Sequence, residues 1–177
     1  LLAFREPTHS PLPIVQRLIT KGVDARLLFC GTGPMQSEIE QKIIQMQLED
    51  YVYIVDPVFG DAKNELLNCT DILVHPSLNE GFSLSVIEGM SVGLAICITD
   101  GFSAREVIKN GENGFLCSTE LEWIKYITFL AKNPRSRMKI KRNNIKKVNR
   151  EFRWSIVGRQ HYTLLQSLIA DKSKLKT

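Results

Sequence analysis

The sequence is poor in residues that build covalent or metal-based sites. It has four cysteines and three histidines in 177 residues. No C-x-x-C pair occurs, and that spacing is the usual sign of a zinc site or a redox motif. The cysteines are Cys30, Cys69, Cys97 and Cys117, and three of them lie within or at the end of apolar, strand-like runs. We therefore expect buried free thiols in a reducing cytoplasm.

Long apolar runs are absent as well, and the first residues do not read as a leader segment. No uninterrupted apolar stretch approaches the ~18 residues that a membrane span needs. The chain opens Leu1-Leu2-Ala3-Phe4-Arg5-Glu6, without an initiator methionine or a basic leader, so no signal peptide is indicated. Because residues 1–4 already read as a short strand, we expect a further domain to precede them. The composition, 44% hydrophobic and 24% charged, is that of an ordinary globular domain.

Acidic residues are missing from one segment, residues 133–150, which carries eight lysines or arginines. The net charge of the chain is +4, so the remainder has 15 basic against 19 acidic residues, a balance of −4. A basic surface over the whole protein, as nucleic-acid binding would favour, is not indicated. A narrow apolar stripe (Met138, Ile145, Val148 and Phe152) predicts a helix packed on the domain. The alternative interpretation is contact with an anionic membrane or a lipid-phosphate acceptor.

Short apolar runs alternate with helical patterns along the chain. We predict six strands, at residues 1–4, 25–30, 51–55, 71–75, 93–98 and 114–117. Thr119 and Glu122 have the spacing of a capping box at a helix start, and residues 155–169 predict the last helix. Strands that alternate with helices indicate an α/β fold, a Rossmann-like, doubly wound parallel sheet of about six strands.

One stretch has the pattern of a ligand site. The run from Ile72 to His75 predicts a buried strand, and the residues after it predict a loop. Leu84, Ile87 and Met90 are spaced at i, i+3 and i+6, which predicts a helix that starts near Ser83. The first amides of a helix lack partners within the helix and lie at the positive end of its dipole. Residues 82–84 are therefore a candidate phosphate cradle.

Two carboxylates flank this predicted helix start. Glu88 lies about one turn inside and would lean back toward the N-terminus, while Glu80 enters from the loop. Carboxylates repel phosphate and only accept hydrogen bonds, so sugar hydroxyls are their natural partners. The implied ligand is a phosphate flanked by sugars. The alternative is an ordinary strand–helix turn, in which both glutamates are solvated surface residues.

The same stretch resembles a known family. The Glu80-x7-Glu88 segment, within residues 76–90, is similar to the E-x7-E segment of retaining GT-B glycosyltransferases of the GT4 type, glycosyltransferase group 1. Gly31-Thr32-Gly33-Pro34 resembles that family's G-x-G-P, and residues 99–116 resemble its later loop, helix and glycine-rich return. The resemblance runs from about residue 25 to about 155. It implies the C-terminal half of a GT-B fold: one nucleotide-sugar-binding domain at 1–170, a basic tail at 171–177, and an N-terminal acceptor domain outside this sequence.

The resemblance also implies a reaction and roles. A hexosyl unit would pass from a nucleoside diphosphate sugar to a hydroxyl acceptor, in polysaccharide or glycolipid synthesis. Glu88 would bind the nucleotide ribose, Glu80 would be the catalytic residue on the transferred sugar, and Arg5 would contact the diphosphate. The donor-binding set is completed by Gly81, Phe82, Ser83 and Leu84. Phe59, in the loop after the third strand, would lie near the nucleobase, or would simply pack on its neighbours.

Departures from the family pattern leave alternatives open. Ser10 stands where the family has a lysine, so that cation is absent or supplied elsewhere. No D-x-D occurs, which argues against the metal-dependent GT-A type, and neither a metal nor a cofactor is expected. A sugar-nucleotide-binding module without catalysis and a flavodoxin-like interaction module remain as other readings. We expect a cytoplasmic protein, peripheral at the inner face of the membrane if residues 133–150 bind it, and no transfer by this chain alone.

Overall fold

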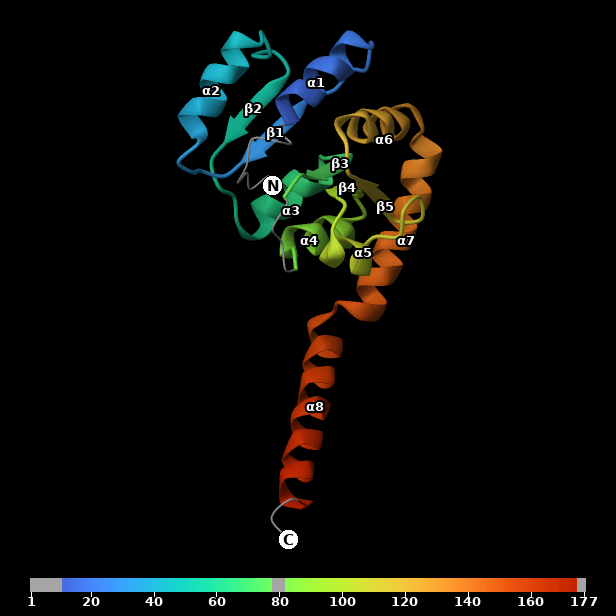
Figure 1. The fold of residues 1–177 in the computed structure, drawn as a ribbon. Coiled ribbons are helices and arrows are strands. Elements are labelled where there is room, and N and C mark those ends of the chain that lie inside the picture. Colours follow the sequence, from blue (N-terminus) through green and yellow to red (C-terminus); the bar gives the residue numbers. More distant parts are fainter. Residues whose placement is uncertain (1–10, 78–81, 175–177) are drawn as a thin grey trace.

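The computed structural model describes residues 11–77 and 82–174, and strands alternate with helices through this part of the chain (Figure 1). The elements in chain order are α1 (Pro11–Thr20), β1 (Leu27–Cys30), α2 (Gln36–Gln45), β2 (Val52–Val55), α3 (Gly60–Asn68), β3 (Ile72–His75), α4 (Leu84–Val92), β4 (Ala95–Thr99), α5 (Phe102–Val107), β5 (Gly114–Cys117), α6 (Glu120–Lys132), α7 (Pro134–Glu151) and α8 (Trp154–Lys174).

The described strands form two parallel sheets. β1 pairs with β2, with Leu27 opposite Val52, and β4 lies between β3 and β5, with Ile96 opposite Leu73 on one side and Gly114 on the other. These pairings confirm the predicted α/β, Rossmann-like class. Five of the six predicted strands are present, and the sixth, Leu1–Phe4, lies outside the described residues.

Helices cover both faces of the three-stranded sheet because its middle strand is apolar on both sides. All five residues of β4 are buried. Ala95 and Cys97 pack with Trp123 and Ile127 of α6 and with α1. Ile96 and Ile98 belong to a second cluster, with Val86 and Met90 of α4 and with α5. The fold is therefore doubly wound, as predicted.

Three of the four cysteines are buried, as the sequence predicts, and the fourth is not. Cys30, Cys97 and Cys117 are buried and Cys69 is exposed, and all four are free thiols. Cys97 and Cys117 lie on the neighbouring strands β4 and β5. A hydrogen bond between the two thiols, together with burial, raises the pKa of the Cys97 thiol well above its usual range. A buried thiol of this kind behaves as a small core residue.

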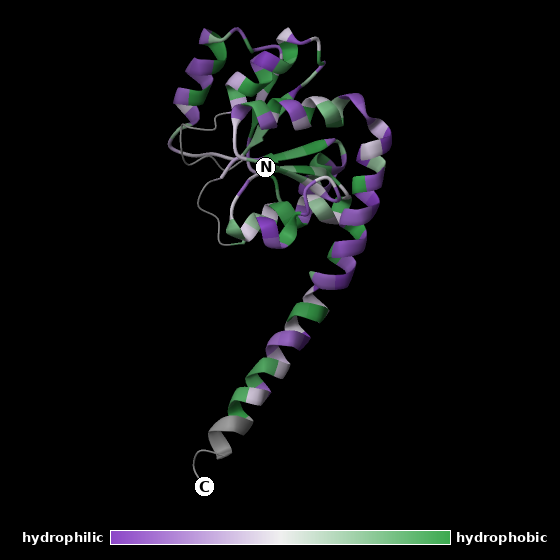
Figure 2. Ribbon diagram, turned by 45° about the vertical axis from the view of Figure 1, so that its right-hand side comes forward, coloured by the Kyte–Doolittle hydropathy of each residue, from purple (hydrophilic) through white to green (hydrophobic). Residues whose placement is uncertain are grey.

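The basic helix α7 packs on the domain through α4, α6 and β4. The predicted stripe is wrong at Met138, which is 54% exposed, because the helix buries Ile140 and Asn144 instead. Asn144 Nδ2 donates a 2.8 Å hydrogen bond to the carbonyl of Leu94, which ties α7 to the turn before β4. Val148 and Phe152 do pack, as predicted, against the second cluster, which contains Val86 and Met90 of α4. Figure 2 shows α7 as a largely hydrophilic helix beside apolar strands.

The last helix, α8, leaves the body of the protein and projects from it (Figure 1). It begins at Trp154, one residue before the predicted start, and runs to Lys174, so the first four residues of the predicted 171–177 tail are helical. Exposed apolar side chains follow its length, among them Trp154, Leu165 and Ile169. In the part of the chain that the structure describes, no helix is long and apolar enough to cross a bilayer.

Gly93 supplies a first test of this packing. It ends α4 in the left-handed region, with φ +87°, and a Cβ placed there would lie 2.4 Å from Cγ of Lys141 on α7. Gly93→Ala should therefore lower the free energy of unfolding by about 1–3 kcal/mol, measured by urea unfolding. The control is Gly158→Ala in α8, where nothing lies within 4 Å of the added Cβ. Equal stability of the two variants would contradict this role of Gly93.

Candidate functional site

The carboxyl ends of three parallel strands define the candidate site. β3 ends at His75, β4 at Thr99 and β5 at Cys117. Strands that run in parallel present these ends at the same edge of a sheet, which is the edge where open α/β sheets bind ligands. The chain leaves β3 at this edge and enters α4 at Leu84. The N-terminus of α4 is therefore at the ligand-binding edge, as the sequence predicts.

The start of α4 has the features of an anion site. Ser83 is the N-cap residue, with φ −90° and ψ 109°, but its side chain makes no capping hydrogen bond. Its hydroxyl instead lies 2.9 Å from the hydroxyl of Ser85. Phe82 is half-exposed and its ring lies 5.8 Å from that of Phe152, at the end of α7. The structure thus brings the three predicted cradle residues, Phe82, Ser83 and Leu84, together at an accessible helix start.

Glu88 lies one turn further along α4 and is held by a partner that the sequence analysis missed. Its Oε1 atom is 2.5 Å from Nζ of Lys63 on α3, and the two side chains are 40% and 25% exposed. The neighbouring Gly89 lets α4 lie close to the sheet, since a Cβ there would be 2.8 Å from Cδ2 of Leu73. The carboxylate therefore sits on a firmly packed helix with one oxygen engaged by a cation. Its second oxygen keeps its acceptor capacity.

A second carboxylate lies at the same edge. Asp100 follows β4 directly, and both of its oxygens accept hydrogen bonds from Arg105 on α5, at 2.7 and 2.9 Å. This ion pair with two hydrogen bonds, called here the Asp100–Arg105 fork, holds the pKa of Asp100 below its usual range. A hydrogen bond from the hydroxyl of Ser118 lowers the pKa by a smaller amount. Such two-pronged pairs fix geometry as well as charge. Arg105 is thus a cation at the ligand edge that sequence spacing alone did not single out.

Two residues at the ends of these strands, His75 and Thr99, and Phe59 in the loop before α3 also bear on the site. His75 is buried at the end of β3, at 2% exposure, which favours a structural role over contact with a ligand. The hydroxyl of Thr99 is buried and has no hydrogen-bond partner within the described residues. Phe59 precedes α3 and is largely exposed, so its contact with a nucleobase stays a prediction. Within residues 11–77 and 82–174, no three His, Cys, Asp or Glu side chains are grouped as metal ligands.

Part of the predicted site falls outside the described residues. These positions are Arg5, Ser10, Glu80 and Gly81. The relation of Glu80 to Glu88 is therefore still a prediction, as is the contact of Arg5 with phosphate.

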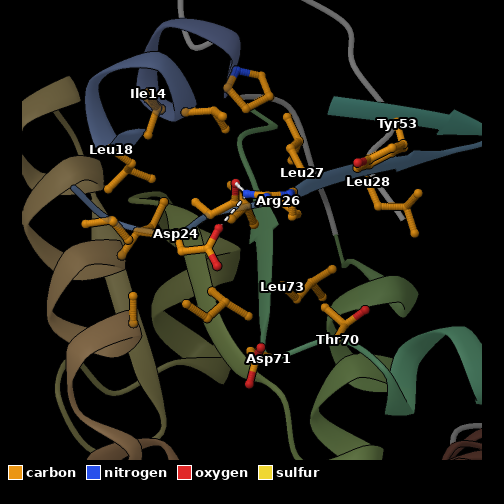
Figure 3. Close-up of a pocket in the computed structure, with 18 of the residues that line it drawn as sticks. Ile14, Leu18, Asp24, Arg26, Leu27, Leu28, Tyr53, Thr70, Asp71 and Leu73 are labelled. Atoms are coloured by element: carbon orange, nitrogen blue, oxygen red, sulfur yellow. Dashed lines mark hydrogen bonds and ion pairs between the residues drawn. The ribbon is translucent and has the colours of Figure 1, made fainter. Parts of the chain in front are cut away.

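A cavity of about 550 Å³ lies elsewhere in the fold (Figure 3). Its walls come from α1, the first residues of β1 and the first residues of β3, and in Figure 3 they include Ile14, Leu18, Leu28 and Leu73. Neither Glu88 nor any residue of the α4 start lines it. The cavity is thus separate from the candidate ligand edge.

Comparison with known proteins decides the family. Residues 12–147 match the family model for glycosyl transferases group 1, which is most of the chain. The chain belongs to the glycosyl transferases group 1. The predicted family is confirmed, and so is the prediction of a C-terminal GT-B domain.

Two curated proteins illustrate the range of the relatives. The chain is 26% identical over 138 residues to glycosyltransferase 1 domain-containing protein 1 of Xenopus tropicalis, covering 77% of this chain and 40% of that protein. It is 34% identical over 101 residues to N-acetyl-alpha-D-glucosaminyl L-malate synthase of Bacillus anthracis, covering 57% of this chain and 26% of that protein. The chain thus spans less than half the length of these relatives.

Solved structures show the same fold. The C-terminal domain of the glycosyl transferase group 1 protein LpcC of Francisella tularensis has a TM-score of 0.73 at 22% identity, over 87% of this chain and 84% of that one. Sucrose-phosphate synthase of Thermosynechococcus elongatus has a TM-score of 0.82 at 19% identity, over 96% of this chain and 45% of that one. Anabaena HepE, solved with UDP and glucose, has a TM-score of 0.71 at 18% identity, over 90% of this chain and 53% of that one.

The Asp100–Arg105 fork predicts a pH-dependent stability. A carboxyl whose folded-state pKa is depressed stabilises the fold above its unfolded pKa of about 3.9, and this contribution is lost as the pH falls through the folded value. Arg105→Gln should therefore lower the thermal midpoint near pH 7, and the difference from the unmodified chain should vanish in acid. Arg159→Gln on α8 is the control, with no such dependence. A difference that persists unchanged at pH 2 would contradict the fork's role.

Proposed function

We propose that this chain is the donor-binding domain of a retaining, GT4-type hexosyltransferase. The donor is a nucleoside diphosphate sugar and the acceptor a hydroxyl group, in polysaccharide or glycolipid synthesis. The observation that carries the proposal is the accessible start of α4 at the ligand edge, with Glu88 one turn inside it. Membership of the group 1 family supports it, as does the complex of the related HepE fold with UDP and glucose.

The roles follow from the chemistry of the side chains and amides. The free amides at residues 82–84 bind a donor phosphate, aided by the dipole of α4. Glu88 accepts hydrogen bonds from the ribose hydroxyls, and Lys63 holds its carboxylate in place through Oε1. Glu80 acts on the transferred sugar, and Arg5 and the helix amides stabilise the charge on the leaving diphosphate, so that no metal is needed.

Lys63 also offers a cation in place of the lysine that the family has at the position of Ser10. A lysine of the family pattern is missing there, yet the Nζ atom of Lys63 lies 2.5 Å from a carboxylate of the proposed donor site. A cation in this position offsets the repulsion between Glu88 and an approaching diphosphate. The missing charge is in this way supplied from α3.

The test of donor binding is calorimetric titration of the chain with UDP, GDP, ADP and their hexose conjugates. One base should be preferred, and Glu88→Ala should weaken its binding about 10- to 150-fold, the cost of a hydrogen bond to a charged group. Glu65→Ala, an exposed acid on α3, is the matched control and should bind as the unmodified chain does.

The same samples separate the alternatives. Acceptor recognition is assigned to the N-terminal domain, so the chain alone should bind donor without steady transfer. A full-length protein that binds donor and never transfers would favour a sugar-nucleotide-binding module. Equal affinity of Glu88→Ala and the unmodified chain, or no nucleotide binding by the full-length protein, would reject the donor site and favour an interaction module.

We further propose that α7 makes peripheral contact with an anionic membrane, because Lys139, Arg142 and Lys146 are exposed and carry no ion pair among the described residues. Changing all three to glutamine should weaken binding to phosphatidylserine vesicles at least about tenfold, since each cation contributes about 1 kcal/mol. The control changes three exposed lysines elsewhere, Lys21, Lys125 and Lys132. Flotation assays in which both triple variants bind equally would refute the proposal.

A further inference from the structure

The start of α4 is only weakly held by its own residues. The side chain of Ser83 makes no capping hydrogen bond, and its carbonyl accepts from the amide of Ile87 at 3.4 Å. That distance exceeds the usual range of about 2.7–3.2 Å. Leu84, the first helical residue, is 61% exposed, and full burial begins only at Val86. Because helix ends fray, a start of this kind needs support from another element to keep one geometry.

A side chain from the end of α7 reaches this helix start. The ring of Phe152 lies 5.8 Å from that of Phe82, and the two planes are inclined by 51°. Tilted rings at this separation attract each other beyond the effect of the area that they bury. Phe152 also packs on the cluster that contains Val86 and Met90. Its ring therefore connects the residue before the α4 cap to the core.

α7 runs along α4 in the opposite direction and contacts both of its ends. Lys141 lies against Gly93, which ends α4, while Phe152 lies against Phe82, which precedes it. Lys141 and Phe152 are the same number of positions apart as Gly93 and Phe82. The two segments thus match in length, and the packing of α7 at one end of α4 sets where Phe152 lies at the other.

Two hydrogen bonds fix the chain around Phe152. Its amide donates to the carbonyl of Val148 at 2.9 Å, and Phe152 is the C-cap residue of α7. Lys147 Nζ donates to the carbonyl of Val107, at the end of α5, at 2.8 Å. The last turn of α7 is therefore tied to α5 as well as to α4, and the ring of Phe152 projects from a supported backbone.

We propose that Phe152 is a positioning residue of the donor site. It acts through Phe82, whose ring it holds, and in this way it fixes the direction of the amides at residues 82–84. This role rests on the proposed function, in which those amides bind a donor phosphate. A capping side chain would make the helix start rigid but would engage an amide of the first turn. A ring contact supplies rigidity and leaves these amides open to the ligand.

The first test uses the 177-residue chain without nucleotide. Backbone ¹⁵N order parameters of Ser83 and Leu84 should be near ~0.85 in the unmodified chain and fall below ~0.6 in Phe152→Ala. The matched control is Phe129→Ala on α6, whose ring also lies 5.8 Å from a second ring, that of Phe115. This control should leave the order at Ser83 and Leu84 unchanged. Equal order in Phe152→Ala and the unmodified chain would overturn the proposal.

The second test separates positioning from a general loss of structure. The chain is titrated with UDP, GDP and ADP, each beside its nucleoside, and binding is followed by amide chemical shifts. Phe152→Ala should weaken binding of the preferred diphosphate about 2- to 12-fold, the effect of one aromatic pair. Binding of its nucleoside should be unchanged, because only the phosphates contact the amides. An equal loss for the diphosphate and the nucleoside would indicate a merely structural role and overturn the proposal.

Conservative variants test whether the ring itself matters. Phe152→Tyr keeps the ring and should bind the diphosphate as the unmodified chain does. Phe152→Leu keeps an apolar side chain without the ring, should show the loss, and replaces Phe152→Ala if that variant does not fold. Full affinity in Phe152→Leu would overturn the proposal and leave the proposed function intact. Absence of nucleotide binding by both the unmodified chain and the full-length protein would reject the proposed function, and this role with it.

Discussion

The arrangement of this domain depends on the burial of one strand. β4 is buried at all five positions, so the sheet must be covered on both faces, by α1 and α6 on one and by α4 and α5 on the other. Parallel pairing of β3 and β5 with β4 then fixes their direction, and with it the edge at which the loop after each of these strands emerges. The position of the α4 start follows from this packing.

Electrostatics at that edge are arranged in pairs. Glu88 is paired with Lys63, and Asp100 with Arg105. Lys63 of α3 lies beside Glu88 of α4, and Arg105 of α5 lies beside Asp100 in the turn after β4, so each carboxylate has a cation next to it. An anionic ligand would therefore meet helix amides and balanced charges rather than bare carboxylates. The acids remain available as acceptors, which suits a ligand with both phosphate and hydroxyl groups.

Features whose signals lie close together in the sequence could be predicted from it. Apolar runs located the strands, and the capping box of Thr119 and Glu122 is present because its two partners are three residues apart. The start of α4 was also predictable, since its signals lie within ten residues. Lys63 could not be found this way, because it is 25 positions from Glu88 and only the packing of α3 on α4 brings them together.

The predicted apolar stripe of α7 was wrong at Met138 for a related reason. Periodicity is compatible with the burial of more than one face of a helix. The elements that pack against the helix determine which face is buried, and in α7 that face includes Asn144, which donates a hydrogen bond to the carbonyl of Leu94.

The projecting helix α8 has a consequence for how the chain moves in solution. Its 21 residues span about 32 Å at 1.5 Å per residue, whereas a compact chain of this length has a radius of gyration of about 16 Å. With α8 extended, the molecule is elongated, and its frictional drag exceeds that of a sphere of equal mass. A monomer will then elute from a sizing column ahead of compact standards, at a position that imitates a larger assembly.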